Sequence, residues 1–197
     1  MRARTIFCAL AATMMLFAAC GKDDDNKNSG GSGGGSGLSI ADNTLMYDGV
    51  TYTFDYVMVD YYHPELTLVN ATTSDTTESG EPLLSIDGIH ITPNAWNKSF
   101  DLADNSNWPD EISVYLIFNG ALDISFDGWV NVDRDISGHL DGVDYEGESI
   151  FESGTYSVSG NNDGTPITVT VDGMLKNGKT LQMKIVTPSY RNQVTGR

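Results

Sequence analysis

Asp-Gly and Asn-Gly pairs interrupt this chain repeatedly, and they constrain its fold more than any other feature. They occur at eight places after residue 47. Both residues of such a pair tolerate the positive φ angles of type I′ hairpin turns. The pairs are Asp48-Gly49, Asp87-Gly88, Asn119-Gly120, Asp127-Gly128, Asp141-Gly142, Asp163-Gly164, Asp172-Gly173 and Asn177-Gly178. Between them lie runs rich in Val, Ile, Thr, Tyr and Phe, so the pattern predicts short antiparallel strands.

The region after residue 37 shows no helical periodicity longer than about two turns, so an all-β class is expected. We take residues 38–197 as the folded domain. A chain of this length can bury roughly 68–70% of its unfolded surface, and it can therefore fold without disulfide staples. We predict a single antiparallel β-sandwich of jelly-roll type, with a closed antiparallel barrel as the alternative.

The Asn119-Gly120 pair predicts the register of one hairpin. A two-residue turn at this pair would set Tyr115 opposite Ile124. Ile117 would then lie opposite Leu122, and one largely apolar face would result.

The Asn177-Gly178 pair does not give a consistent hairpin in the same way. A two-residue turn there leaves the apolar residues of the two strands on opposite faces. One extra residue repairs the pattern, so we predict a β-bulge at Asp172-Gly173, opposite Gln182. Val171 then lies opposite Met183.

Charge is distributed unevenly along the chain. There are 27 acidic residues against 11 Lys and Arg, which gives a formal net charge of -16 and argues against nucleic acid as a partner. From residue 38 to residue 172 there are 24 acids and two bases, whereas residues 173–197 carry five bases and no acid. We predict that the last hairpin places its lysines beside acidic strands, with a functional basic patch as the alternative.

Residues 1–19 have the composition of a secretory signal peptide. Arg2 and Arg4 precede an apolar run, and two alanines close it. The run is shorter than the about 20 apolar residues that a membrane span needs. We therefore expect this segment to be removed after export.

Cys20 directly follows Phe17-Ala18-Ala19, and this sequence resembles a bacterial lipobox, although Phe17 departs from the usual Leu. The resemblance implies that Cys20 is lipidated and holds the protein to outer-membrane lipid. An ordinary signal peptide with an incidental cysteine is the alternative. Residues 20–25 also resemble the export signal of Bacteroidota surface lipoproteins, which implies a location on the cell surface; a solvated charge run is the alternative. Residues 26–37 form a flexible Gly/Ser tether with a reach on the order of 20 Å.

Both ends of the domain carry strand and turn motifs that resemble small all-β surface lipoproteins of Bacteroidales. The motifs are Tyr47–Tyr52, Ser153–Val158, Ile167–Gly173 and Leu175–Leu181. The resemblance implies a surface lipoprotein with a β-sandwich or barrel body. It implies no particular activity, because the motifs consist of strand and turn residues.

Motifs for enzymatic chemistry are not found in the sequence. The three histidines are far apart in the chain, and there is no Gly-x-Ser-x-Gly elbow, P-loop or Gly-x-Gly-x-x-Gly. The spacing of the acids does not single out a pair of glycosidase carboxylates. We expect a protein that is not an enzyme and needs no cofactor.

One acidic segment, residues 101–111, offers oxygen ligands of the kind that calcium binds. Its candidate metal ligands are Asp101, Asp104 and Asp110. The segment lacks the residue order of an EF-hand. A solvated loop held by Asx-turns is the interpretation that we favour, with calcium as the alternative.

Aromatic residues near predicted loops give the best indication of a binding site. Trp96 and Trp108 stand beside Asn, Asp and Pro, and Tyr61 with Tyr62 could line the same rim. A flat ring covers the C–H face of a sugar while amides and carboxylates bind its hydroxyls. The competing interpretation, which we favour, is that the two tryptophans cap the ends of the core. We place Trp129 in the core.

These observations predict a non-catalytic surface lipoprotein that binds a glycan or another extracellular ligand. A structural or adhesive subunit that associates through strand edges is the second possibility. A glycosidase-type enzyme is the third.

Overall fold

The computed structural model describes residues 39–63, 65–161 and 163–190. The predicted signal peptide, Cys20 and the tether lie outside these residues. Within the described ranges, no helix has the length and apolar character to cross a membrane.

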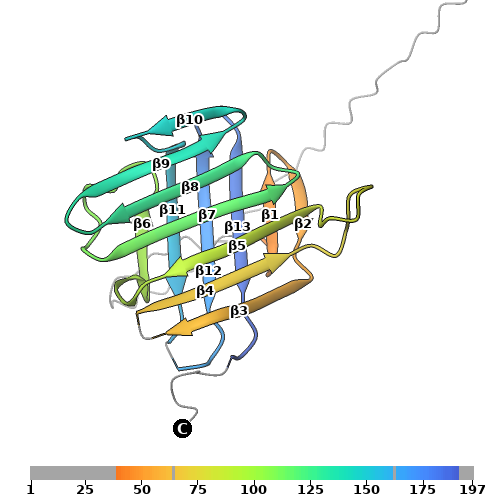
Figure 1. Ribbon diagram of the computed structural model, residues 1–197, viewed down its shortest axis with the longest axis horizontal. Coiled ribbons are helices and arrows are strands. Elements are labelled where there is room, and N and C mark those ends of the chain that lie inside the picture. The colour runs from red at the N-terminus through yellow and green to blue at the C-terminus, as the bar shows by residue number, and fades with distance from the viewer. Residues whose placement is uncertain (1–38, 64, 162, 191–197) are drawn as a thin grey trace, which may run out of the picture. The chain divides into compact units, whose positions relative to one another are not determined.

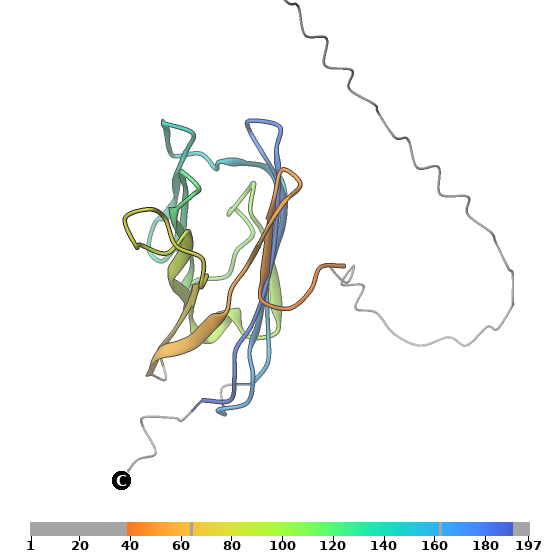
Figure 2. The same ribbon diagram turned by 90° about the vertical axis from the view of Figure 1, so that its right-hand side faces the viewer.

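The described chain folds into two antiparallel sheets that face each other as two layers (Figures 1 and 2). The six-stranded sheet, in the order β2-β1-β13-β12-β11-β6, consists of β1 (Thr44–Tyr47), β2 (Val50–Thr53), β6 (Lys98–Asp101), β11 (Phe151–Ser159), β12 (Thr168–Leu175) and β13 (Thr180–Val186). The seven-stranded sheet, in the order β10-β9-β8-β7-β5-β4-β3, consists of β3 (Tyr56–His63), β4 (Leu66–Thr72), β5 (Leu84–Ile91), β7 (Ile112–Gly120), β8 (Ile124–Val130), β9 (Arg134–Leu140) and β10 (Val143–Glu146). A short 3₁₀ helix, η1 (Pro93–Ala95), precedes β6.

The predicted β-sandwich is confirmed, and the barrel alternative is wrong because each sheet ends in two unjoined edge strands. Figure 1 shows the strands of the front sheet crossing those of the back sheet at a steep angle. Such crossing is typical of orthogonally packed sheets.

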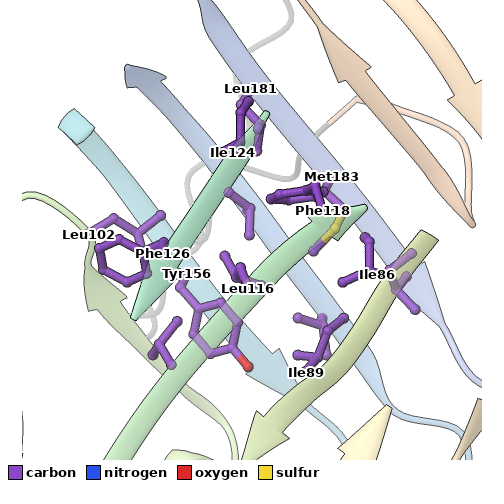
Figure 3. Close-up of a cluster of buried hydrophobic side chains, with 14 of the residues drawn as sticks. Ile86, Ile89, Leu102, Leu116, Phe118, Ile124, Phe126, Tyr156, Leu181 and Met183 are labelled. Carbon is purple, nitrogen blue, oxygen red and sulfur yellow. The ribbon is translucent and has the colours of Figure 1, made fainter. Parts of the chain in front are cut away.

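The core lies between the sheets and is built by alternation along the strands. In β7 and β8 every second residue is buried, as expected when one face of a sheet meets the core. Figure 3 shows side chains from both sheets meeting there, among them Leu116 and Phe126 from one sheet and Tyr156 and Met183 from the other. Each buried side chain of this size contributes about 1.5–3 kcal/mol.

Two of the predicted hairpin turns are confirmed. Asp48-Gly49 and Asp141-Gly142 both have positive φ at each residue, 48° and 81° in the first and 49° and 81° in the second. Leu140 pairs with Val143 across the second turn, which leaves a two-residue connection between β9 and β10.

The predicted register at Asn119-Gly120 is wrong. This pair continues β7 instead of turning, because it pairs with β5. The connection therefore begins later, and Phe118 pairs with Ile124. The register is displaced by three residues, and an odd displacement reverses the faces of a strand. Tyr115 consequently points away from the core.

The predicted bulge at Asp172-Gly173 is also wrong. Asp172 pairs with Gln182 in a ladder that keeps its register along the whole of β12 and β13. The predicted pairing of Val171 with Met183 is confirmed.

The extra residue that the hydrophobic pattern requires is accommodated in the turn and not in a bulge. The Leu175 N–H donates to the Lys179 carbonyl at 2.9 Å, so residues 176–178 form a three-residue loop. Gly178 has a φ of 80°, as the left-handed position of such a loop requires.

The lysines of the last hairpin lie beside acidic strands and loops, as predicted. The ion pairs are Lys176–Glu148, Lys179–Asp141 and Lys184–Asp42.

Candidate ligand-binding face

Trp108, one of the predicted ligand-binding residues, is buried in the core. Its side chain is 3% exposed, and its indole Nε1–H donates to the Asp101 carbonyl at 2.8 Å. The ring also packs against Phe100, with centroids 5.6 Å apart. A buried ring has no free face for a sugar, so the prediction of an exposed Trp108 is wrong and the competing core interpretation holds.

Trp96 does not form an exposed aromatic site with Trp108. Trp96 is half-buried after η1 and packs against the core. Asn97 beside it exchanges two hydrogen bonds with the Gly160 backbone, which fixes this corner of the sandwich. Tyr61 and Tyr62 belong to β3, and their side chains lie outside the described residues.

The acidic segment 101–111 forms local turns. Asp101 accepts the Ala103 N–H at 2.9 Å, and Asp104 accepts the Ser106 N–H at 2.8 Å. The Ser106 hydroxyl also donates to Asp104 at 2.7 Å. These bonds are the Asx-turns that we favoured.

Asp101, Asp104 and Asp110 do not converge on a common point. Among the described residues no three His, Cys, Asp or Glu side chains are grouped so that they could hold a metal ion. The geometry therefore does not support a calcium site on these carboxylates.

The outer face of the seven-stranded sheet carries a different set of polar and aromatic side chains. In β8 the residues at 124, 126, 128 and 130 are buried, so those between them point outward. Trp129 is one of these and is 52% exposed, which makes our placement of Trp129 in the core wrong. On this face Trp129 lies opposite Ser113 of β7 and Asp135 of β9.

The next row of the same face contains a stacked pair of rings. Tyr115 of β7 lies opposite Asp127 of β8. The ring of His90, from β5, stacks on Tyr115 with centroids 4.8 Å apart and an interplanar angle of 27°. His90 Nδ1 also lies 3.3 Å from the Ser113 hydroxyl. The rings and carboxylates thus stand on neighbouring strands of one surface.

A third row contains a histidine held between two carboxylates. His139 Nδ1 lies 2.6 Å from Asp144 and its Nε2 lies 3.1 Å from Asp123. These hydrogen bonds raise the pKa of His139, and the bond to Asp144 has the largest effect. They also tie the short edge strand β10 to the residue just before β8.

Two hollows lie along this face. One, of about 330 Å³, is lined by side chains that include Tyr115, Asp127 and His139. The other, of about 260 Å³, lies at the β8–β9 turn and is lined by residues that include Trp129 and Asp135. We call the surface that contains Trp129, Tyr115, His90, Asp127 and Asp135 the aromatic-acidic face.

Partial burial shapes the electrostatics of the aromatic-acidic face. Loss of hydration raises the pKa of Asp127, an effect that nearby His90 opposes and nearby Asp135 increases. Burial lowers the pKa of His90. Both shifts favour the uncharged forms of these two groups.

The outer face of the six-stranded sheet is chemically different. Ser99, Ser157 and Thr170 form a row on it, and the first two hydroxyls lie 2.7 Å apart. This row of hydroxyls contrasts with the rings and carboxylates of the aromatic-acidic face.

Part of the aromatic-acidic face could have been found from the sequence and part could not. The alternation of Ile124, Phe126, Gly128 and Val130 was a usable signal, because it places Trp129 on the outer face. The stacking of His90 on Tyr115 was not visible, because it depends on the pairing of β5 with β7 across a long connection.

Comparison of the chain with family models, with curated proteins and with solved structures found no match.

Proposed function

We propose that this protein is a non-catalytic surface lipoprotein that binds a glycan on the aromatic-acidic face. The observation that carries the proposal is the exposed ring of Trp129, next to the stacked rings of His90 and Tyr115. Exposed aromatic rings on a sheet surface offer flat apolar area at low entropic cost, because a ring has few rotatable bonds.

The polar groups of this face complement the rings. Asp127 and Asp135 can accept hydrogen bonds from sugar hydroxyls, and Ser113 can donate or accept. All three lie in the two rows that contain Tyr115 and Trp129. A pyranose placed over a ring would therefore find partners for its hydroxyls at its edge.

Binding is favoured over hydrolysis by the position of the carboxylates. Asp127 and Asp135 are diagonal neighbours on β8 and β9. A glycosidase places its two carboxyl groups on either side of the scissile bond. Here Asp127 and Asp135 lie side by side on the same sheet surface, so they do not face each other across a cleft.

The proposed attachment rests on the sequence of residues 1–37. A lipidated Cys20 and a Gly/Ser tether would hold the domain at the outer membrane while leaving both outer faces of the sandwich accessible. Such an arrangement suits capture of a ligand from the medium.

Assembly through a strand edge is a second candidate, and β3 favours it. The edge strands β2, β6 and β10 each have four residues, whereas β3 has eight. Tyr56 and Met58 on β3 are 63% and 53% exposed. However, the pairing of β3 shifts between Val59 and Tyr61, and such irregularities oppose edge-to-edge association. Concentration-dependent sedimentation would detect this assembly.

Tryptophan fluorescence tests the glycan proposal. The whole protein in mild detergent is titrated with a broad panel of oligosaccharides, and a binding glycan should change the emission of exposed Trp129. Trp129→Ala should lose both the signal and calorimetrically measured binding. Met174→Ala is the matched control, because Met174 is an apolar side chain, 44% exposed, on the other sheet. Unchanged binding by Trp129→Ala would contradict the proposal.

A further inference from the structure

We infer that the aromatic-acidic face selects amine-bearing, cationic glycans over neutral and anionic ones. The inference rests on the proposed function and specifies the chemical class of its ligand. Three observations carry it: the charges that line the hollows, the unpaired state of Asp127, and the use of the basic side chains elsewhere in the domain.

The hollows on this face are lined by acids. Asp127, Asp144 and Glu146 line the hollow that contains Tyr115, and Asp133 with Asp135 line the one beside Trp129. No Lys or Arg is among the described residues that line either hollow. The basic group present is His139, which two carboxylates already hold.

Asp127 is a carboxylate of this face that no described side chain pairs. Within the described residues it takes part in no hydrogen bond and no ion pair. The protein removes part of its hydration, which raises its pKa. A ligand ammonium would restore the lost stabilisation through a charge-assisted hydrogen bond. A neutral glycan would instead cover this carboxylate without supplying a positive charge.

The described basic side chains are directed to other partners. Arg134 Nη1 donates to the carbonyls of Asn105 and Trp108, at 2.7 and 3.0 Å. The three lysines of the last hairpin form ion pairs, and two of them also lie over tyrosine rings, Lys176 over Tyr145 and Lys179 over Tyr47. Lys98 lies on β6 of the other sheet. A uronate or sulfate group would therefore meet like charge on this face, with no Lys or Arg among the described residues that line its hollows.

The rings support the same ligand class. An ammonium within about 6 Å of an aromatic face is attracted by the ring, most strongly by Trp. Trp129 and Tyr115 stand next to the acids, so one amino group could contact a ring and a carboxylate together. A sugar that carries both C–H faces and amines could therefore contact the rings and the carboxylates at the same time.

Calorimetric titration with three tetrasaccharides tests the inference. The probes are a chitosan tetramer, its fully N-acetylated analogue and tetragalacturonate, used with the whole protein at pH 5.5, where the amines are protonated. We expect about tenfold tighter binding of the chitosan tetramer than of the acetylated analogue, and no binding of tetragalacturonate.

Two variants localise the effect. Asp127→Asn should remove most of the tenfold preference, because it should weaken binding of the chitosan tetramer far more than binding of the acetylated tetramer: the amide can still hydrogen-bond sugar hydroxyls but carries no charge. Asp172→Asn is the matched control, because Asp172 is an exposed acid on the outer face of the six-stranded sheet, where it bonds Gln182. It should keep the preference, since it removes the same charge from the opposite face.

The outcomes separate the two proposals. Equal affinity for the chitosan and acetylated tetramers would overturn the inference and leave the proposed glycan site intact. Tetralysine binding as tightly as the chitosan tetramer would also overturn it, because charge alone would then suffice. Failure of every probe, and of the broad panel, would remove the proposed function together with the inference.

Discussion

At the scale of single residues, two histidines on one sheet have opposite electrostatic environments. Burial lowers the pKa of His90, against a smaller opposing effect of Asp127. Hydrogen bonds that His139 donates to Asp144 and, with a smaller effect, to Asp123 raise the pKa of His139. The ordinary value is 6.5 for both. The protein thus favours the neutral form of one ring and the charged form of the other.

The two rings should titrate on either side of pH 6.5. In an NMR titration we expect the midpoint of His139 above this value and that of His90 below it. His63→Gln removes the third imidazole signal and leaves these two to be assigned. A His139 midpoint at or below that of His90 would contradict the two hydrogen bonds.

The same shift makes stability depend on pH in a defined direction. A pKa raised on folding means that the native state binds the proton more tightly, so His139 stabilises the fold below pH 6.5. This contribution is lost as pH rises through the raised pKa. His139→Gln should therefore lower the urea midpoint at pH 6 and have a smaller effect at pH 9. An equal loss at both pH values would assign His139 a packing role instead.

Gly128, again at the scale of single residues, shows that an Asp-Gly pair can stand either in a turn or inside a strand. Asp127-Gly128 has the composition of a turn, yet Gly128 lies inside β8. A Cβ at this position would stand 2.7 Å from the ring of Trp108. Gly128 therefore leaves space for a buried tryptophan. Local composition cannot distinguish a glycine chosen for positive φ from one chosen for close approach.

At the scale of the elements, the β12–β13 hairpin depends on one left-handed residue. Gly178 has a φ of 80°, and a Cβ there would find no atom within 4 Å. A substitution at Gly178 therefore changes backbone conformational energy without causing a clash. Substitutions at Gly178 therefore test whether the loop requires a left-handed residue.

Gly178→Ala should destabilise the protein by about 1–2 kcal/mol, because alanine is strained in the left-handed region. Gly178→Asn should cost less, since asparagine enters that region more readily. Urea unfolding of both variants measures the difference. Equal stabilities for Ala and Asn would show that the loop does not require the left-handed conformation.

The hairpins also show which registers a sequence can specify. In β12 and β13 most of the apolar residues occupy one face, so the pairing of Val171 with Met183 could be predicted. In β7 both faces carry apolar residues, with Leu116 buried and Tyr115 and Ile117 on the outer side. The hydrophobic pattern then fits either register, and only the pairing with β5 decides between them.

At the scale of the whole molecule, the sandwich itself was predictable but its strand order was not. Alternating runs and turn pairs are enough to indicate two packed sheets. The order depends on pairings between distant segments, such as β1 with β13 and β6 with β11. The aromatic-acidic face was hidden for the same reason, because it is assembled from β5, β7, β8 and β9.

The excess of negative charge also affects the stability of the whole molecule. The 24 acids of residues 38–172 are accompanied by two bases in the same stretch, and the last hairpin neutralises a few of them. Repulsion among the remaining acids opposes folding, because the compact state brings like charges together. Each exposed ion pair offsets only about 0–1 kcal/mol of this.

Moderate salt should therefore stabilise the protein. Raising NaCl from 10 mM to 200 mM shortens the Debye length from about 30 Å to below 10 Å and screens the many repulsions more than it weakens the few close pairs. We expect the free energy of unfolding in urea to rise by about 1 kcal/mol. KCl at the same ionic strength should give the same gain, because the effect is screening and not sodium binding. A lower stability in salt would mean that the ion pairs of the last hairpin outweigh the repulsion among the acids.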